Sequence, residues 1–184
     1  MNKISNRINS LPKEDKQLLD SLIEVKEFKK GQLIFDETEK DNSIYYVVEG
    51  LLRKYILKDG NEKTLDFYFS DDLYFPTVLQ QNKRTNSFLQ AIDKTTIYKL
   101  DNFKFEKLKV SNLNLLELEN LILEIAYTQT TERLQNFQTM NATERYINLL
   151  DRNSKIVQQI ALTYIASYLG INNASLSKIR ANLK

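Results

Sequence analysis

The chain has 184 residues, of which 42% are hydrophobic and 27% charged, and its net charge is +2. This length suits one ordinary domain or two small ones, with the composition of a globular protein. There is no cysteine and no histidine, which excludes disulfides, thiolate zinc sites, imidazole catalysis and histidine-bound haem. We therefore expect no metal, no cofactor and no enzyme activity. No apolar run approaches the ~20 residues of a membrane span, and the N-terminus does not resemble a secretion signal, so we expect a cytoplasmic protein without a membrane partner.

The first hundred residues change from a helical pattern to a strand pattern. A helix is predicted to begin near Pro12, with apolar residues repeating behind it as far as Ile23. Short β-rich runs then follow between Val25 and Leu100. The predicted strands are Gln32–Phe35, Ile44–Glu49, Leu51–Lys58, Lys63–Phe69, Ser87–Ile92 and Thr95–Leu100, and Asp59-Gly60 is a strong hairpin signal. Short strands at such close spacing favour a β-sandwich or roll.

Helical patterns occupy the chain after Asp101, which is a plausible N-cap. A short helix is predicted over 102–109 and a long one over about 112–138. One apolar stripe of the long helix is formed by Leu118, Ile122 and Ile125, and a second by Leu116, Leu123 and Tyr127. A helix that is apolar on two sides needs two covering surfaces, and we expect these to be the β domain and a second copy of the chain. We assign Leu118, Ile122 and Ile125 to dimerisation; complete burial of the helix within one monomer is the alternative.

The charge is divided unevenly along the chain. Residues 1–137 carry 20 Lys and Arg against 22 acids, whereas residues 138–184 carry six against two. From Arg152 onward there is no acidic residue. A basic terminal segment on a near-neutral body indicates a polyanionic partner, although a chance surface imbalance would give the same count.

The sharpest local signal is the stretch from Leu162 to Ala181, which fits a helix-turn-helix. A tight turn between two crossing helices requires a small residue in the first helix and a residue that tolerates a left-handed backbone, and Ala166 and Gly170 supply them. Asn172 or Asn173 can cap the second helix. The positions expected to face inward are all apolar: Ile165, Leu169, Ile171, Leu176 and Ile179. The alternative is an ordinary helical hairpin, but such a hairpin seldom satisfies all of these positions in one stretch. We therefore favour a DNA-binding helix-turn-helix, with double-stranded DNA as the partner.

In this motif the second helix, from about Asn173 to Asn182, enters the major groove. The residues expected at base edges are Asn173, Ser177 and Lys178. Those placed for phosphates are Thr163, Asn172 and Ser175, with Arg180 and Lys184 adding charge. A dimer would set two such helices ~34 Å apart, one helical turn of DNA.

Several segments resemble the Crp/Fnr regulators, the family of the cyclic-AMP receptor protein. These are Phe28 to Phe35, the strand-Gly-strand run Tyr45 to Arg53, the four glycines at turns, and Ala142 to Tyr146. The resemblance covers nearly the whole chain and implies an α+β fold. It implies an antiparallel β-roll of cyclic-nucleotide-binding type (1–111), a long dimerisation helix (112–138) and a winged-helix-like helix-turn-helix domain (139–184). The sequence stops at Lys184, directly after the second helix of the motif, so we expect no wing within these 184 residues.

The resemblance also implies a DNA-binding activator or repressor that works as a homodimer with RNA polymerase. Asn173, Ala174 and Lys178 match positions from which family members read bases. The middle position is commonly acidic in the family, so we expect the DNA site of this chain to differ from the usual one.

The sensor part departs from the family members that bind cyclic nucleotides. Phe75-Pro76 stands where they have Gly-Glu, and Thr85-Asn86 stands where they have an Arg pair, with Arg84 one position away. Phe75 would crowd the phosphate, and Pro76 offers neither a carboxylate nor an amide donor. We therefore predict no binding of cyclic AMP and an unknown effector. The residues assigned to the altered pocket are Tyr74, Phe75, Arg84 and Phe88, although aromatic residues on strands are more often core.

Two further functions compete with a DNA-binding regulator. One is a small-molecule or nucleotide sensor that acts through protein contacts and retains only vestigial DNA binding. The other is an enzyme on a cupin-like roll, which the absence of histidine disfavours because such enzymes usually hold a metal through histidines.

Overall fold

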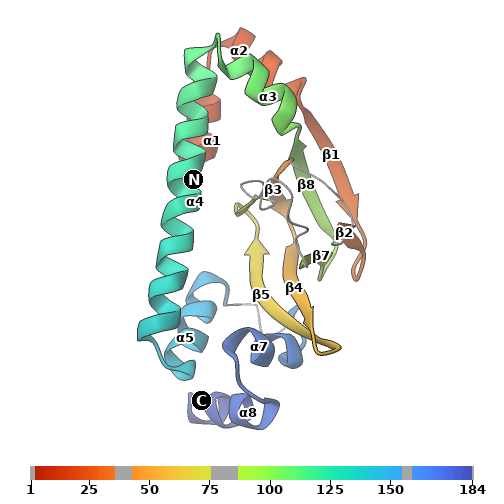
Figure 1. Cartoon of the computed structure of the whole chain (residues 1–184), viewed down its shortest axis with the longest axis vertical. Coiled ribbons are helices and arrows are strands. Elements are labelled where there is room, and N and C mark those ends of the chain that lie inside the picture. The colour runs from red at the N-terminus through yellow and green to blue at the C-terminus, as the bar shows by residue number, and fades with distance from the viewer. Residues whose placement is uncertain (1–2, 36–42, 76–86, 155–158, 184) are drawn as a thin grey trace.

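The computed structural model describes residues 3–35, 43–75, 87–154 and 159–183. A β-roll lies beside one long helix, and the C-terminal helices lie at the end of the roll where that helix finishes (Figure 1). None of the helices in these four ranges is long and apolar enough to cross a membrane.

Two short helices begin the chain. The predicted helix behind Pro12 is confirmed as α2 (Lys13–Asp20), and it is preceded by α1 (Lys3–Ser10), which the sequence pattern did not reveal. In α1, Ile4 is buried and Arg7 forms an ion pair with Glu117 of the long helix. Because α1 spans only about two turns, its stability depends on these tertiary contacts more than on local propensity.

The roll consists of two antiparallel four-stranded sheets. The first has the order β1 (Ile23–Phe28), β8 (Thr95–Leu100), β3 (Ile44–Glu49) and β6 (Leu73–Tyr74). The second has the order β2 (Leu33–Phe35), β7 (Ser87–Ala91), β4 (Leu51–Lys58) and β5 (Asn61–Phe69). All six predicted strands are confirmed to within two residues at each end. The sequence pattern missed β1, an edge strand rich in charge, and β6, which is only two residues long.

Two turns explain how the strands are connected. Asp59 and Gly60 both have positive φ, at 53° and 72°, as a two-residue hairpin turn between β4 and β5 requires. Gly50 carries the chain from the first sheet to the second with φ at 105°. A Cβ atom there would lie 2.5 Å from the carbonyl oxygen of Lys94, so the close approach of the two segments requires glycine.

The interior of the roll is filled by side chains from both sheets. Val47, Leu52, Leu89 and Ile97 have no measurable exposure. The aromatic rings of Phe35, Tyr45, Tyr68 and Tyr74 contact one another among them, with ring centroids 5.2 to 6.2 Å apart. We attribute most of the stability of the roll to the burial of this apolar surface.

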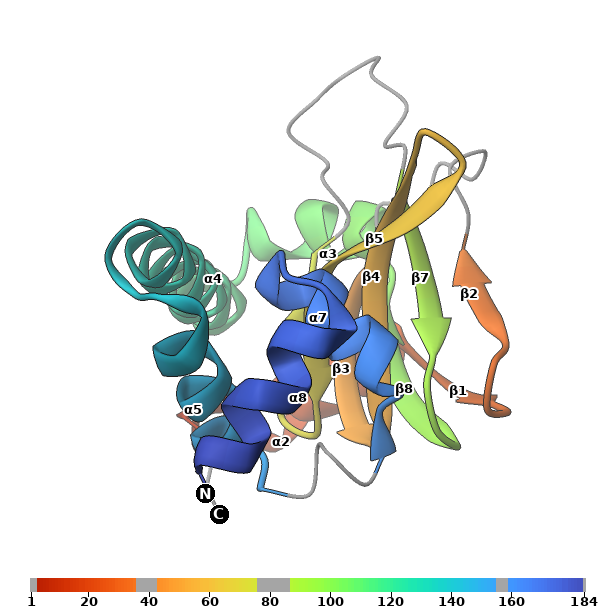
Figure 2. The same ribbon diagram turned by 90° about the horizontal axis from the view of Figure 1, so that it is seen from below.

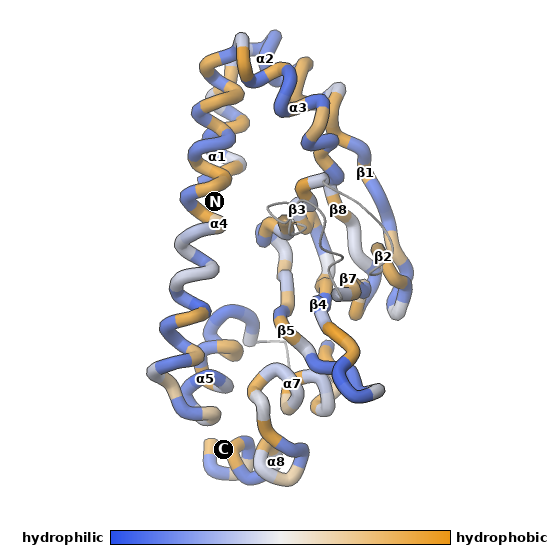
Figure 3. The backbone as a smooth tube through the Cα atoms, viewed as in Figure 1, coloured by the Kyte–Doolittle hydropathy of each residue, from blue (hydrophilic) through white to orange (hydrophobic). Residues whose placement is uncertain are grey.

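Three capped helices follow the roll. Asp101 caps α3 (Asn102–Lys109), as predicted, and Asn112 caps α4 (Leu113–Thr139) by accepting from the backbone N–H of Leu115 at 3.1 Å. A capping box formed by Asn141 and Glu144 begins α5 (Ala142–Arg152). Apolar residues recur along α4, most densely in the half that lies beside α1 (Figure 3).

Candidate nucleic-acid interface

The last two helices have the geometry of a helix-turn-helix. They are α7 (Leu162–Leu169) and α8 (Asn173–Asn182), with Gly170 in the left-handed conformation at φ 69°. Asn172 caps α8 by accepting from the backbone N–H of Ser175 at 2.8 Å. Ile165, Ala166, Leu169 and Leu176 are buried, and Ile171 and Ile179 pack against them. The local structure predicted from the sequence is therefore confirmed.

The outer face of α8 is open to solvent. Asn173, Ser177 and Lys178 are exposed, whereas Leu176 between them is fully buried. Seen along the axis of the long helix, α8 is in front of α7, at the end of the molecule (Figure 2). The N-terminal end of α8 presents backbone amides and a helix dipole that favours phosphate, and the Lys178 ammonium group follows about one turn further along the helix.

The remaining predicted contact residues lie around this face. Thr163 and Asn172 are exposed, while Ser175 and Arg180 are partly buried. The carboxamide oxygen of Asn172 is already used in the cap, and the Ser177 hydroxyl donates to the carbonyl oxygen of Asn173 at 2.9 Å. The Asn172 carboxamide NH₂ and the second lone pair of the Ser177 hydroxyl remain as hydrogen-bonding groups that a nucleic acid can meet.

Two of the basic residues behind the charge argument are engaged inside the molecule. Arg145 donates to the carbonyl oxygen of Leu169 at 2.7 Å, so it fixes α5 to the end of α7. Arg152 lies 3.2 Å from the Asp72 carboxylate and 5.3 Å from the Phe69 ring. Lys155 and Lys184 lie outside the described residues. The count of six basic residues therefore overstates the positive charge available to DNA. Among the described residues of the segment, Lys178 and Arg180 are the two that remain for DNA binding.

The helix-turn-helix rests on the β-roll. The Ser167 hydroxyl on α7 accepts from the backbone N–H of Thr64 on β5 at 3.0 Å. The guanidinium of Arg53 on β4 lies 3.5 Å from the centre of the Tyr164 ring. A common apolar cluster joins both parts, with Leu51, Phe67 and Phe69 from the roll and Leu149, Ile165 and Leu169 from the helices.

Arg53 was not identified from the sequence. Its side chain has no measurable exposure, and it donates to the Thr64 hydroxyl at 2.9 Å and to Glu62 at 2.6 Å. It sits between the rings of Tyr55 and Tyr164. The sequence gives little signal for this burial, because β4 also contains Lys54 and Lys58 and a solvent-exposed arginine would produce the same pattern.

The predicted seam residues of α4 face their own chain. Leu118 and Ile122 are 1% and 5% exposed and belong to a cluster with Ile4, Leu19 and Leu100, against which Ile125 also packs. The other stripe, Leu116, Leu123 and Tyr127, is exposed. Both stripes are apolar in the sequence, and only the position of α1 and the first sheet shows which is covered. We correct the assignment accordingly and propose the exposed stripe as the seam.

The predicted ligand-pocket residues do not come together. Tyr74 is buried in the interior of the roll, whereas Phe75 packs against the cluster beside α4. Phe88 stacks on Tyr55 at 5.0 Å, on the opposite side of β7 from the interior residue Leu89. Arg84 lies outside the described residues, as do Pro76, Thr85 and Asn86. Strand alternation explains the separation, because neighbouring residues on a strand point to opposite faces.

A buried ion pair joins the second sheet to α4. Asp66 on β5 is 1% exposed and pairs with Arg133 on α4. Burial raises the pKa of the Asp66 carboxyl, an effect that the nearby Arg133 charge partly offsets. Burial likewise raises the pKa of the Tyr68 hydroxyl and lowers that of the Lys54 ammonium. Bulky rings and these polar groups occupy the interior of the roll next to α4.

Comparison with known proteins gives a family model and several relatives. Residues 25–112 match the model described as a cyclic nucleotide-binding domain. The chain is 26% identical to the anaerobic regulatory protein of Haemophilus influenzae, over 92% of this chain and 71% of that protein.

Solved structures share the fold at lower sequence identity. A Crp/Fnr-family transcriptional regulator from Eubacterium rectale has a TM-score of 0.70 at 18% identity, over 95% of this chain and 84% of that one. FixK2 from Bradyrhizobium japonicum has the same score and identity, over 88% and 84% of the two chains. The predicted architecture, a β-roll followed by helices, is therefore confirmed.

Proposed function

We propose that this chain is a sequence-specific DNA-binding transcription regulator of the Crp/Fnr type that acts as a homodimer. Its match to the cyclic nucleotide-binding domain model and its similarity to the anaerobic regulatory protein and to a Crp/Fnr-family structure support the proposal. The observation that carries the proposal is the open face of α8, capped by Asn172 and carrying Asn173, Ser177 and Lys178. RNA polymerase is the further partner that such a role requires, and the cytoplasm is the compartment in which it would work.

Base reading would fall to the exposed side chains of α8. Asn173 can pair with both hydrogen-bonding groups of adenine, and Lys178 can donate to the acceptors of guanine. Thr163, Asn172, Ser175 and Arg180 surround them at positions suited to phosphates. Because few cations are available, we expect the affinity to depend strongly on two half-sites being bound together.

A dimer seam is available on α4. Eight positions follow the alternating 3–4 spacing of a coiled coil: Leu113, Leu116, Asn120, Leu123, Tyr127, Thr130, Leu134 and Phe137. All eight are exposed, and six of them are large hydrophobic residues. Leu118 and Ile125 occupy the opposite side of the heptad. A symmetric partner that covers this stripe would remove an apolar surface that runs for about 36 Å along the helix.

The geometry of such a dimer suits DNA. If the two copies of α4 pair side by side in parallel, both α8 helices lie at the same end of the assembly, because α8 lies beyond the C-terminal end of α4 (Figure 1). Asn120, which with Thr130 is one of the two polar residues inside the seam, would favour one register of the two helices. A two-fold axis along the seam then predicts an inverted-repeat DNA site.

Site selection from a random DNA pool tests the proposal, followed by fluorescence anisotropy with the selected duplex. We expect saturable binding to an inverted repeat, which weakens as salt rises because counterions are released. Lys178→Ala should weaken specific binding by about 1–3 kcal/mol and relax the preference at one base position in each half-site. Lys94→Ala is the matched control, since Lys94 is an exposed lysine on the roll.

Binding without any sequence preference would contradict the proposal. It would favour the alternative of a sensor module that acts through protein contacts. An unchanged site preference in the Lys178→Ala variant would remove Lys178 from the reading residues and leave the remaining residues of α8 to be tested in the same way.

A further inference from the structure

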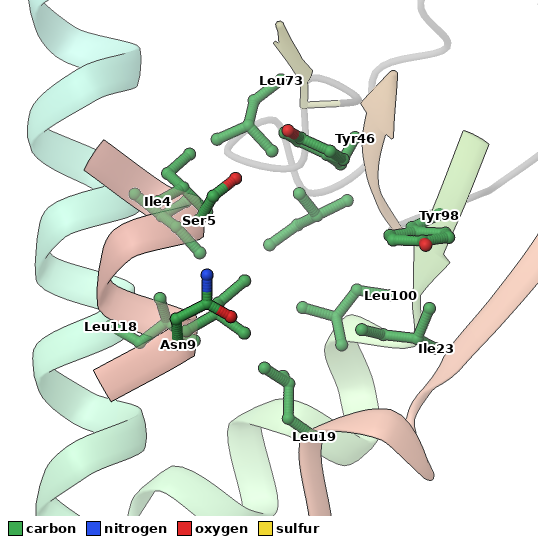
Figure 4. Close-up of a pocket in the computed structure, with 13 residues that line it drawn as sticks. Ile4, Ser5, Asn9, Leu19, Ile23, Tyr46, Leu73, Tyr98, Leu100 and Leu118 are labelled. Carbon is green, nitrogen blue, oxygen red and sulfur yellow. The ribbon is translucent and has the colours of Figure 1, made fainter. Parts of the chain in front are cut away.

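A cavity of about 300 Å³ lies between α1, α4 and the first sheet (Figure 4). Its sheet wall includes Ile44 and Tyr46 of β3 and Leu100 of β8, and its helical walls include Ile4 of α1 and Leu118 of α4. It is separate from the interior of the roll, which receives the alternate residues of the same strands, such as Tyr45 and Val47. The cavity therefore occupies the other face of the first sheet.

The walls of the cavity are fixed by polar contacts at its edge. Arg7 of α1 pairs with Glu117 of α4 and donates to the side chain of Asn114 at 3.3 Å. Asp15 of α2 accepts from the side chains of Asn112 and Asn114 at 2.6 and 2.7 Å. These contacts hold both N-terminal helices against the start of α4 and maintain the space between them and the sheet.

The chemistry of the lining indicates what can occupy the cavity. It contains no charged residue, and most of its side chains are aliphatic. Its polar groups come from Ser5 and Asn9 of α1 and from Tyr46 and Tyr98 of the sheet, and Figure 4 shows the first two on the helical side and the last two on the sheet side. The Tyr46 hydroxyl already donates to the Asp71 carboxylate. An ionised ligand would lose its hydration without gaining a counter-charge, whereas an apolar chain with one hydroxyl or carbonyl would keep its hydrogen bond.

The size of the cavity limits the ligand. An apolar cavity of about 150 Å³ in another protein accommodates benzene, so about 300 Å³ suits roughly ten to fifteen non-hydrogen atoms. We propose that this cavity binds an uncharged, largely apolar molecule of that size, which carries one hydrogen-bonding group near Ser5 and Asn9.

The position of the cavity connects it to the proposed function. Leu118 and Ile122 line it from α4, while Leu116 and Leu123 on the opposite side of the same turns belong to the proposed seam. A molecule that fills the cavity would alter how α4 packs against the first sheet, and hence how the seam is presented to a second copy. This coupling step rests on the proposed function, whereas binding itself does not.

Two ligands of matched chain, 1-decanol and decanoate, test the binding on the full-length protein. The isoleucine methyl groups can be followed by NMR during titration, because Ile4, Ile8 and Ile44 line the cavity whereas Ile147 and Ile165 lie elsewhere. We expect saturable shifts confined to the cavity isoleucines with 1-decanol, and binding at least about tenfold weaker with decanoate at pH 7.

Cavity-filling variants provide the second measurement. Ile8→Phe and Ser5→Phe each place a ring in the cavity and should weaken 1-decanol binding at least about tenfold, as judged by the ligand-induced rise in Tm. Asn6→Phe is the matched control, because Asn6 is exposed on α1 and is not among the lining residues. Should the filling variants fail to fold, the methyl shifts of the unmodified protein still decide the question.

Three results would overturn the inference: no saturable methyl shifts with 1-decanol, shifts spread equally over Ile147 and Ile165, or equal affinity for decanoate. Anisotropy with the selected DNA separates the two proposals. Loss of 1-decanol binding with intact DNA binding refutes this inference alone, and 1-decanol binding without specific DNA binding refutes the proposed function alone. When both hold, 1-decanol should change the DNA affinity about fivefold or more, the lower range of allosteric coupling.

Discussion

Arg53 shows how a single residue connects the sensor to the helix-turn-helix. Its guanidinium is removed from water and held by Thr64, Glu62 and two tyrosine rings. Tyr164, one of those rings, belongs to α7, so the same side chain contacts both parts of the molecule. A buried charge of this kind is stable only while its partners stay in place.

Replacement of Arg53 by alanine should therefore destabilise the protein and loosen α7. We expect Arg53→Ala to lower the free energy of unfolding by about 2–4 kcal/mol, because packing, two hydrogen bonds and two ring contacts are lost together. Glu62→Gln should cost less than about 1 kcal/mol, since the Glu62 carboxylate is 42% exposed. Urea denaturation measures the free energy of unfolding of both variants. If Arg53→Ala and Glu62→Gln lower it equally, the ion pair, not the buried stacking, holds the guanidinium.

Asp66 predicts a dependence of stability on pH. Burial raises its pKa in the folded protein above the ordinary value of 3.8. The protonated carboxyl is then favoured by folding, so its contribution is complete below the ordinary pKa and is lost as pH rises through the raised one. The free energy of unfolding should decline over that interval, and this part of the decline should be absent in Asp66→Asn.

Chemical denaturation at a series of pH values checks this prediction. The readout is the slope of the free energy of unfolding against pH, not its absolute value. Asp66→Asn also removes the partner of Arg133, which shifts the whole curve. Burial likewise raises the pKa of Asp72, so a smaller decline should persist in the variant. Asp20→Asn, at an exposed carboxylate, is the control. A variant curve parallel to that of the unmodified protein would contradict the prediction.

At the scale of the element, α4 is the clearest case of two functions on one helix. Leu118 and Ile122 pack against the N-terminal helices and the first sheet, while the opposite stripe remains exposed. Adjacent residues on this helix should thus respond differently to the same substitution.

Leu123→Asp should abolish dimerisation with little effect on the fold, because Leu123 is 54% exposed and an aspartate in the seam would face its symmetry mate. Ile122→Asp should instead lower the free energy of unfolding by about 3 kcal/mol or more, because it places a carboxylate in an apolar cluster. Sedimentation velocity and thermal denaturation separate the two effects. A Leu123→Asp variant that sediments as a dimer would show that the seam lies elsewhere.

For the whole molecule, the shared core matters most. Leu51, Phe67, Phe69 and Ile92 of the roll pack in one cluster with α5, α7 and α8. The sequence suggested separate sensor and DNA-binding domains with a boundary near residue 139. Packing of the helix-turn-helix on β5 means that neither part buries its apolar surface alone.

We therefore predict one cooperative unfolding transition for the roll and the helix-turn-helix. Phe67→Ala should lower the free energy of unfolding by about 3–5 kcal/mol and move the signals of strands and helices together. Val25→Ala, at an exposed residue of β1, should change it by less than about 0.5 kcal/mol. Calorimetry combined with circular dichroism measures this, and two separate transitions would show that the shared cluster does not couple the parts.

The sequence by itself determined six of the eight strands in the described residues, the long helix, the helix-turn-helix and the family resemblance. Those features follow from local periodicity, glycines at turns and capping residues, which act over a few neighbouring positions. Only the tertiary structure decided which stripe of α4 is covered, that Arg145 and Arg152 are engaged internally, that Arg53 is buried, and that a cavity lies behind α1. Each of these depends on contacts between segments distant in the chain, and a local pattern of apolar or charged residues is the same whichever partner covers it.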